Sequence, residues 1–325
     1  MKKRLLCILL AVFFVFIFPW AYFTARSNRK AEQGVETVET IEKVTDAQLE
    51  NASCLISVLT EEDVTIKMDI EDYVTAVVLC EMPADFEMDA IKAQAVVART
   101  YALRRHERGS KHAAAAVCTS AGCCQGYCSE GEFLANGGTK VAVDKVRDAV
   151  IQTKGEVLIY NGSLIEAVYF SCSGGKTEDA MAVWGADIPY LQSTDSPGEE
   201  HATHYTDSVT YSSKEFAELL GFRTAKPVNA WVETVIYTKG GGVDRITICG
   251  KEYKGTFIRS KLNLRSTCFI MTVVGDRITV TTKGYGHRVG MSQYGADAMA
   301  MQGDDYTQIL SHYYQGAVLH KYDGN

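Results

Sequence analysis

The chain has 325 residues, 46% hydrophobic and 22% charged, which is an ordinary globular composition that argues against a fibrous or low-complexity protein. The formal net charge is −7, but six of the 33 basic residues lie within the first 30 positions, where there is no acidic residue. The rest of the chain therefore carries 27 basic against 40 acidic residues, a net charge of −13, and such an acidic body argues against nucleic acid as a partner.

The N-terminus holds the longest apolar run of the chain, residues 5–25, directly after three basic residues. About 20 apolar residues suffice to cross a bilayer as a helix, and the basic residues before the run indicate that the N-terminus stays in the cytoplasm. The bulky residues at its outer end favour an uncleaved anchor over a cleaved secretory signal. We expect a cytoplasmic stub and transmembrane anchor over 1–25, a polar tether over 26–52, and an extracytoplasmic domain over 53–325.

The first part of this domain changes from strand to helix periodicity. Two short strands are expected at 55–58 and 64–68, followed by helices over 70–82 and 87–107. Pro83 ends the first helix, and Asp85 is a plausible cap for the second, whose many alanines allow close packing. The cysteine-rich residues 109–128 that follow are expected to form a loop.

The second half of the chain is mainly strands. Strands are expected at 156–160, 164–170, 231–237, 245–248, 270–274 and 277–281, with helices at 141–153, 214–220, 293–301 and 306–313. The strongest hairpin signal is Asn161-Gly162. The predicted class is α+β, with antiparallel sheet hairpins and with helices early and late around a substrate cleft.

Glu81 is the residue of the first helix that stands out. It follows Val74 by seven residues and Val77 by four, so it continues the apolar face. A carboxyl group in apolar surroundings holds its proton more firmly than one in water, which suits a general acid near neutral pH. The residues alone leave a second interpretation open, in which Glu81 simply pairs with a base of the next helix.

The second helix carries such bases. Lys92 and Arg99 are seven residues apart and share one face, and Gln94 and Tyr101 have the same spacing on what we take to be an adjacent face. This row of polar residues is either the solvated side of the helix or a partly buried surface beside Glu81.

The loop over 109–128 contains four of the ten cysteines. Within it, His112, Cys118 and Cys124 are separated by six residues each, and imidazole with thiolates is a typical zinc ligand set. The spacing predicts a structural zinc site that pins the loop, with Cys128 or water as the fourth ligand. A disulfide between Cys118 and Cys128 is the competing interpretation.

Several blocks of sequence resemble the stage II sporulation protein D (SpoIID) family. The blocks are Glu81-Met82-Pro83, residues 90–102 (AIKAQAVVARTYA), residues 170–178 (FSCSGGKTE), Trp184-Gly185, Pro189-Tyr190-Leu191, Leu264-Arg265-Ser266, Gly286-His287 and residues 289–296 (VGMSQYGA). They occur in the expected order across residues 55–320, which is nearly the whole of the chain after the tether.

The resemblance implies a lytic transglycosylase of peptidoglycan. Such an enzyme cleaves the bond between N-acetylmuramic acid and N-acetylglucosamine in peptide-denuded glycan strands and leaves 1,6-anhydro ends. The family's single acid/base maps onto Glu81. Substrate-binding roles are then expected for Lys92, Arg99, Tyr101, Ser171, Lys176, His287 and Gln293. Some members of the family carry a metal at the positions of His112, Cys118 and Cys124.

The resemblance also implies a setting and partners. The protein would act in engulfment during sporulation and face the space between mother cell and forespore, beside a cell-wall amidase and a membrane protein of the engulfment machinery. Arg288 departs from the family, which has a small residue after the histidine, so His287 is either a cleft residue or a packed one. Two other functions stay open: a non-catalytic, wall-binding enhancer of an amidase, and a zinc hydrolase.

Overall fold

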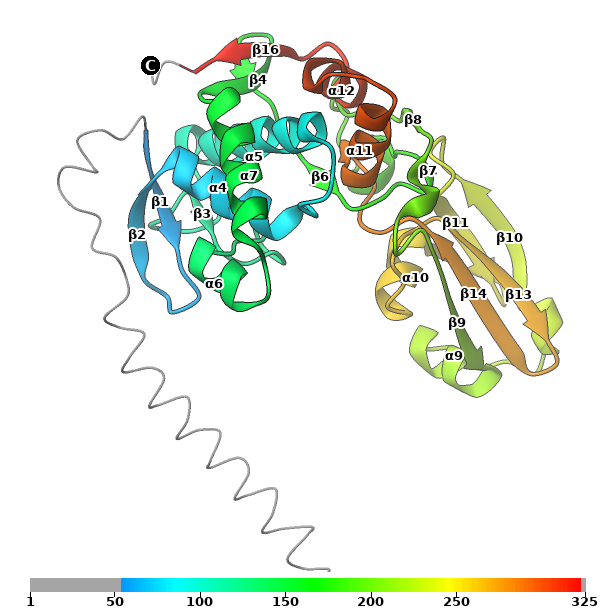
Figure 1. Ribbon diagram of the computed structural model, residues 1–325. Coiled ribbons are helices and arrows are strands. Elements are labelled where there is room, and N and C mark those ends of the chain that lie inside the picture. The colour runs from blue at the N-terminus through cyan, green and yellow to red at the C-terminus, as the bar shows by residue number, and fades with distance from the viewer. Residues whose placement is uncertain (1–53, 323–325) are drawn as a thin grey trace, which may run out of the picture. The chain divides into compact units, whose positions relative to one another are not determined.

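A computed structural model describes residues 54–322 (Figure 1). The predicted anchor over 1–25 and the predicted tether over 26–52 lie outside the described residues. Between residues 54 and 322, no helix combines the length and the apolar character that crossing a bilayer requires. Helices and small sheets are mixed along this part of the chain, so the predicted α+β class is confirmed.

The helices of the first half and the last two helices share one hydrophobic core. In chain order the first half contains β1 (Leu55–Leu59), β2 (Thr65–Asp69), α4 (Ile70–Glu81), α5 (Met88–Arg108), β3 (Val117–Cys118), α6 (Glu130–Ala135), α7 (Lys140–Gln152), β4 (Glu156–Tyr160), β5 (Ser163–Leu164), β6 (Tyr169–Phe170), β7 (Gly175–Lys176), α8 (Ala180–Trp184), β8 (Asp195–Ser196) and the 3₁₀ helix η3 (Glu199–His201). The chain ends with β15 (Met291–Ser292), α11 (Gln293–Met301), α12 (Tyr306–Tyr313) and β16 (Val318–Lys321).

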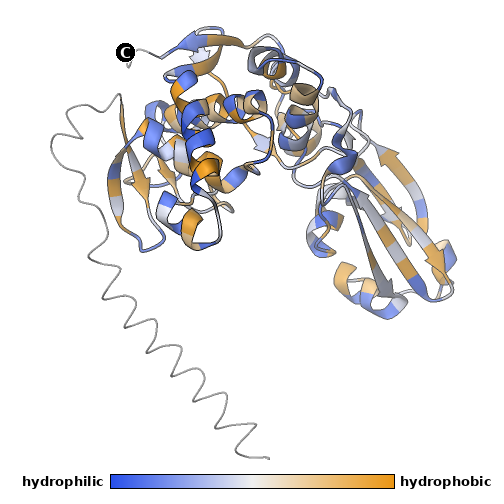
Figure 2. Cartoon of the chain, viewed as in Figure 1, coloured by the Kyte–Doolittle hydropathy of each residue, from blue (hydrophilic) through white to orange (hydrophobic). Residues whose placement is uncertain are grey.

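The strands between these two regions enclose a second, smaller core. They are β9 (Thr206–Ser212), β10 (Val232–Tyr237), β11 (Val243–Ile248), β12 (Lys251–Lys254), β13 (Phe269–Val274) and β14 (Arg277–Lys283), with α9 (Ser213–Leu220), η4 (Val228–Ala230) and α10 (Gly255–Lys261) between them. They form two antiparallel sheets, β10-β11-β12 and β13-β14-β9. Hydropathy alternates along β14 (Figure 2), because Ile278 and Val280 point into the core while Thr279 and Thr281 point out.

Helices α4 and α5 form where the sequence predicts them, and they pack against each other. Val74 and Val77 are fully buried on α4, as their spacing indicates. The cap of α5 differs from the prediction, because Asp85 is not its N-cap. The cap is Glu87, and its N–H donates to the Asp297 carboxylate of α11 at 2.7 Å. A distant residue thus satisfies a helix end that the local sequence leaves open.

The predicted hairpin at Asn161-Gly162 is confirmed. Both residues have positive φ, 50° and 72°, which the tight two-residue turn between β4 and β5 requires. The predicted strand over 164–170 is interrupted, however. β5 ends at Leu164, and β6 leaves the hairpin to pair in parallel with β15, while β16 pairs with the other edge of β4.

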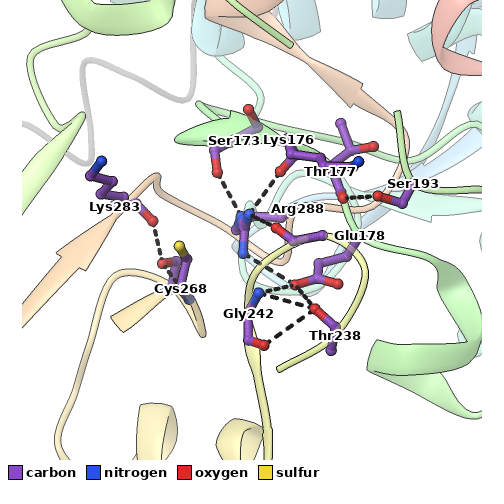
Figure 3. A network of polar contacts seen from close by, with 12 residues as sticks. Ser173, Lys176, Thr177, Glu178, Ser193, Thr238, Gly242, Cys268, Lys283 and Arg288 are labelled. Carbon is purple, nitrogen blue, oxygen red and sulfur yellow. Dashed lines mark hydrogen bonds and ion pairs between the residues drawn. The ribbon is translucent and has the colours of Figure 1, made fainter. Parts of the chain in front are cut away.

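A buried arginine joins the β10–β11 turn to the segment around β7. Arg288 is 1% exposed, and its guanidinium donates to the carbonyl oxygens of Ser173 at 2.6 Å, Lys176 at 2.7 Å and Gly240 at 2.6 Å. It also pairs with Glu178 at 3.2 Å (Figure 3). A buried charge is tolerated when it is paired and hydrogen-bonded in this way. The family departure at Arg288 therefore has a structural role.

Candidate active site

Glu81 is the last residue of α4 and is half-buried. Its Oε1 accepts the N–H of Gly126 at 2.6 Å, and its backbone oxygen accepts the side-chain amide of Gln293 at 3.0 Å. No cationic side chain lies within ion-pairing distance of Glu81 in the part of the chain that the structure describes. The second interpretation, in which Glu81 pairs with a base of α5, is therefore not realised among residues 54–322, and a neutral backbone donor holds the carboxylate instead.

Gly126 can approach the carboxylate because it has no side chain. A Cβ at this position would lie 2.8 Å from Cys80 Sγ and 2.9 Å from Glu81 Oε1, both closer than real Cβ contacts. A glycine is needed wherever the backbone must come this near to another group. Gly126 lies within the cysteine-rich segment 109–128, so the path of that loop determines where the Glu81 carboxylate sits.

Two side chains of helix α11 hydrogen-bond to the turn between α4 and α5. Gln293 and Asp297 are four residues apart and share one face of α11. Gln293 holds the Glu81 backbone, and Asp297 caps α5 at Glu87. Gln293 thus contacts Glu81, but as a support for its backbone. Asp297 was missed from the sequence, although its spacing from Gln293 was a usable signal.

Neither Lys92 nor Arg99 forms an ion pair with Glu81 in the described part of the chain. Lys92 Nζ is 3.6 Å from Asp89 Oδ1 and 5.7 Å from the centroid of the Tyr306 ring. Arg99 has no exposed surface. Its Nε and Nη2 donate to the Glu71 carboxylate at 3.0 and 2.5 Å, and Nη1 donates to a backbone oxygen of β4 at 3.1 Å. A guanidinium with no exposed surface cannot touch a sugar, so the structure gives Arg99 a structural role in place of the predicted substrate contact.

Tyr101 lies on the opposite side of α5 from Arg99. Two positions along an α-helix correspond to a rotation of about 200°. The face that carries Tyr101 is therefore opposite the face of Arg99, and not adjacent to it as expected. Tyr101 is 9% exposed and lies under the Arg105 guanidinium at 4.9 Å, and burial, with the nearby Cys124 as the next cause, raises the pKa of its hydroxyl. It therefore belongs to the side of α5 that meets the cysteine loop.

His287 is a packed histidine. Its ring centroid lies 5.7 Å from that of Phe170 and 5.3 Å from that of Trp184, and Nδ1 accepts the N–H of Val289 at 3.1 Å. Burial, and next the positive charge of Arg259, lowers the pKa of His287 to about 4. The structure thus packs and hydrogen-bonds the half-buried His287 ring, which is neutral at neutral pH, and a place for it in a cleft stays a prediction.

Ser171 and Lys176 flank the buried Ser173 turn. The Ser171 backbone oxygen accepts the N–H of Tyr294 at 3.0 Å, and Lys176 Nζ lies 3.3 Å from Asp195 at the surface. Neither residue forms a hydrogen bond or an ion pair with Glu81 among residues 54–322. Two shallow hollows lie against α9 and β12, and Glu81 lines neither, so the substrate cleft around Glu81 stays a prediction.

The cysteine loop brings four possible metal ligands together. The ligand atoms of His112, Cys118, Cys123 and Cys124 all lie within 4.8 Å of one another. His112 Nε2 is 3.4 Å from Cys124 Sγ and 3.5 Å from Cys123 Sγ. Tetrahedral zinc with ordinary bond lengths would separate such atoms by roughly 3.6 Å, so this donor set fits zinc.

The fourth ligand atom in this cluster belongs to Cys123, whereas the thiol of Cys128, the fourth ligand expected from the sequence beside water, lies outside the cluster. The Cys128 N–H donates to Ala76 of α4 at 3.2 Å, and its thiol turns to the Ser129 backbone oxygen. The short path from Cys124 to Cys128 runs past Glu81 and along α4, which carries the thiol away from His112. The cysteines between residues 54 and 322 are all free thiols, so the disulfide interpretation is not realised there.

Comparisons with known proteins identify relatives over most of the chain. Residues 59–160 match the family model SpoIID, described as stage II sporulation protein. The chain is 37% identical to stage II sporulation protein D of Bacillus amyloliquefaciens, over 98% of this chain and 94% of the relative. It is 36% identical to the protein of the same name in Bacillus subtilis (strain 168), over 92% and 85%. An amidase enhancer of Bacillus subtilis is 30% identical over 74% of this chain and 39% of its own length.

Proposed function

The chain belongs to the stage II sporulation protein D family, and we propose that it is a lytic transglycosylase that uses Glu81 as its single acid/base. The substrate class is peptide-denuded peptidoglycan glycan, cut between N-acetylmuramic acid and N-acetylglucosamine. The observation that carries the proposal is the half-buried Glu81 carboxylate, which is held by a backbone N–H and has no cationic partner between residues 54 and 322. Such a group can both give and take a proton.

The chemistry requires one carboxyl group in two successive roles. Protonated Glu81 first donates its proton to the glycosidic oxygen as that bond breaks. The resulting carboxylate then takes the proton of the C6 hydroxyl of the same sugar, whose oxygen closes on the anomeric carbon. A hydrolytic glycosidase needs a second carboxyl group to activate water or to attack. The acids that follow Glu81, namely Asp85 and Glu87, are exposed on the turn before α5, which supports the single-residue scheme.

The cysteine loop is proposed to bind one structural zinc ion through His112, Cys118, Cys123 and Cys124. Four protein ligands are typical of structural zinc sites, whereas catalytic sites keep an open position for water. The donor set therefore disfavours the zinc hydrolase alternative. A bound ion would neutralise thiolate charge and fix the loop that leads to Gly126.

Zinc content provides the test of this site. Cys124→Ser should lose the metal and several degrees of thermal stability, because a structural ion contributes directly to folding. Cys128→Ser is the matched control, since Cys128 lies outside the cluster. It should keep one equivalent of zinc. Equal zinc content in the two variants, or none in the wild type purified without chelators, would contradict the assignment.

The setting is also a proposal. The N-terminal apolar run would anchor the chain with its domain outside the cytoplasm, beside a cell-wall amidase and a membrane protein of the engulfment machinery. Because one relative is named an amidase enhancer, stimulation of a purified amidase by the domain is the informative assay. Protease treatment of sporulating cells before and after wall removal tests the orientation, since an extracytoplasmic domain becomes digestible once the wall is removed, whereas the membrane keeps protecting a cytoplasmic one.

The enzymatic proposal is tested by a digest of denuded glycan strands. The wild type should release products with 1,6-anhydro ends, and Glu81→Gln should release none, because an amide can neither give nor take the proton. Glu87→Gln is the matched control, since it changes an exposed glutamate only six residues away. If neither the wild type nor the control cleaves glycan but both stimulate an amidase, the chain is an enhancer and the proposal fails.

A further inference from the structure

Two exposed aromatic rings lie near each other on the surface of the molecule. Trp184, the last residue of α8, is 45% exposed, and Tyr285, which follows β14, is 40% exposed. The ring centroid of Trp184 lies 5.3 Å from that of His287, which is only two residues from Tyr285. Two residues span at most about 8 Å of chain, so both rings lie within reach of one extended ligand. Tryptophan is highly buried on average, and the proposed chemistry at Glu81 gives neither ring a role.

Packed neighbours hold both rings in place. The His287 ring that packs on Trp184 also contacts the buried ring of Phe170 at 5.7 Å between centroids. The backbone of Tyr285 is paired with that of Cys172: its N–H donates at 2.7 Å, and its oxygen accepts at 3.2 Å. A ring that is held before a ligand binds loses little conformational freedom on binding. The geometry therefore favours a preformed binding surface.

An arginine adds hydrogen-bond donors beside Tyr285. The guanidinium carbon of Arg265 lies 5.1 Å from the centroid of the Tyr285 ring, and its Nε donates to Asp207 at 2.9 Å. The Arg265 side chain is 30% exposed, and neither of its Nη groups forms a hydrogen bond between residues 54 and 322. A guanidinium carries five N–H donors in a planar fork, so most of the donors of Arg265 remain for a ligand.

Positive charge predominates around Arg265 in spite of Asp207. The Nε of Arg259 donates at 3.3 Å to the backbone oxygen of Leu264, the residue directly before Arg265. Arg259 forms no ion pair in the part of the chain that the structure describes. Two arginines therefore stand against one aspartate, which favours an anionic ligand. A guanidinium binds a carboxylate through two parallel hydrogen bonds.

Short connections join this surface to the proposed acid/base. Phe170, which contacts His287, pairs with Ser292 where β6 and β15 run side by side. The next residue, Gln293, donates its side-chain amide to the backbone oxygen of Glu81 at 3.0 Å. A glycan strand is a long polymer, so a strand that is cut at one point also extends over the neighbouring surface.

We propose that Trp184, Tyr285 and Arg265 form a subsite for the glycan strand that selects denuded strands. The two rings contact the apolar C–H faces of the sugars, and Arg265 binds the free lactyl carboxylate of N-acetylmuramic acid. In a strand that carries peptides, this carboxyl group is part of an amide bond and has no charge. The subsite rests on the proposed function for its meaning as a selector of substrate, but its binding can be measured without cleavage.

The test compares two ligands on a chain that cannot cleave them. The full-length Glu81→Gln chain, the parent, is titrated with denuded glycan strands and with the same strands after their lactyl carboxyl groups are converted to uncharged methylamides. The parent should bind the denuded strands about tenfold more tightly, because the methylamide cannot form the charge-assisted hydrogen bonds. Adding Arg265→Gln should remove this preference, so that both ligands bind as the methylamide binds the parent.

Two further variants of the parent separate the role of the charge from that of the rings. Trp184→Ala should weaken the binding of both ligands by the same factor, several-fold, because the ring contacts the sugar and not the carboxylate. Arg277→Gln is the matched control, since it makes the same charge change at an exposed residue at the other end of β14, about 20 Å along the strand. It should bind both ligands as the parent does.

Three results would overturn the inference. The first is a parent that binds the two ligands equally or binds neither. The second is a loss of affinity in Arg265→Gln that is the same for both ligands or is matched by Arg277→Gln, because the arginine would then not recognise the carboxylate. The third is tight, Arg265-dependent binding of strands that still carry peptides, because a peptide carboxylate would then be the ligand.

The outcomes also separate the subsite from the proposed function. A wild type that cleaves no glycan, in a chain whose parent prefers the charged strands through Arg265, would end the proposed function and support the subsite. Cleavage to anhydro products without this preference would support the proposed function and overturn the subsite.

Discussion

Replacing Arg99 with methionine should destabilise the fold strongly and leave the chemistry intact. The change keeps a long apolar stem but removes the guanidinium that donates to Glu71 and to backbone oxygens at Val150 and Glu156. The Glu71 carboxylate would then keep only the Gly155 N–H as a partner. Breaking a buried ion pair by removing one partner costs roughly 3–5 kcal/mol.

The lower end of this range applies, because the Glu71 side chain is 15% exposed and can recover some hydration. A loss of about 3 kcal/mol from the 5–15 kcal/mol typical of a domain leaves the protein folded. The apparent melting temperature should fall by roughly 6–12 °C. Urea unfolding of wild type and Arg99→Met measures the loss, and glycan cleavage at low temperature measures the activity that remains.

A double variant sharpens the prediction. The double variant Glu71→Met/Arg99→Met removes both charges. Its loss of unfolding free energy should be smaller than the sum of the losses in the two single variants by at least about 1 kcal/mol. Arg99→Met with wild-type unfolding free energy but no cleavage would refute the reasoning, because it would mean that the guanidinium acts on substrate after all.

Three further predictions concern Gly126, His287 and Lys176. Gly126→Ala should lower kcat at least about tenfold, since its Cβ would displace the Glu81 carboxylate, and steady-state kinetics measure this. Its unfolding free energy, measured by urea unfolding, should change by less than about 1 kcal/mol. His287 has a folded pKa of about 4 against 6.5 when unperturbed, so the unfolded chain takes up a proton first and stability falls as pH drops from 6.5 to 4. In His287→Gln the melting temperature should lose this part of its pH dependence, and an unchanged acid slope would contradict the assignment. Lys176→Met should change the unfolding free energy by less than about 0.5 kcal/mol, because its ion pair with Asp195 is exposed. A large loss of glycan binding by this variant in a direct binding assay would therefore point to substrate contact.

The sequence predicts those parts of the fold whose cause is local. The helices around Glu81 follow from apolar spacing, and the Asn161-Gly162 hairpin follows from the positive φ that its turn demands. The two-residue strands β6 and β15 were out of reach, because so short a pairing carries no periodicity and depends on which distant segment lies alongside. The spacing of Asp297 from Gln293 places the two on one face of α11, but that Asp297 caps α5 depends likewise on which distant segment lies alongside.

For the site, the sequence identifies residues better than their roles. The apolar register singles out Glu81, and ligand chemistry singles out three of the four clustered metal donors. The helical spacing of Lys92 and Arg99 is correct, and Arg99 does face α4, but spacing does not say which turn of α4 lies beside it. The buried partner of Arg99 is therefore Glu71 rather than Glu81. Arg288 is similar, since only the fold reveals the ring of carbonyl oxygens that its guanidinium fills (Figure 3).

The central claim is that the C6 hydroxyl of the sugar, and not water, attacks the anomeric carbon while Glu81 handles both protons. Digestion of glycan strands in water enriched in ¹⁸O, followed by mass spectrometry of the products, tests it most directly. The account predicts anhydro ends that contain no solvent oxygen and are lighter by one water than hydrolysis products, and no products at all from Glu81→Gln. Reducing ends that carry ¹⁸O would contradict it, because they would show that water is the nucleophile.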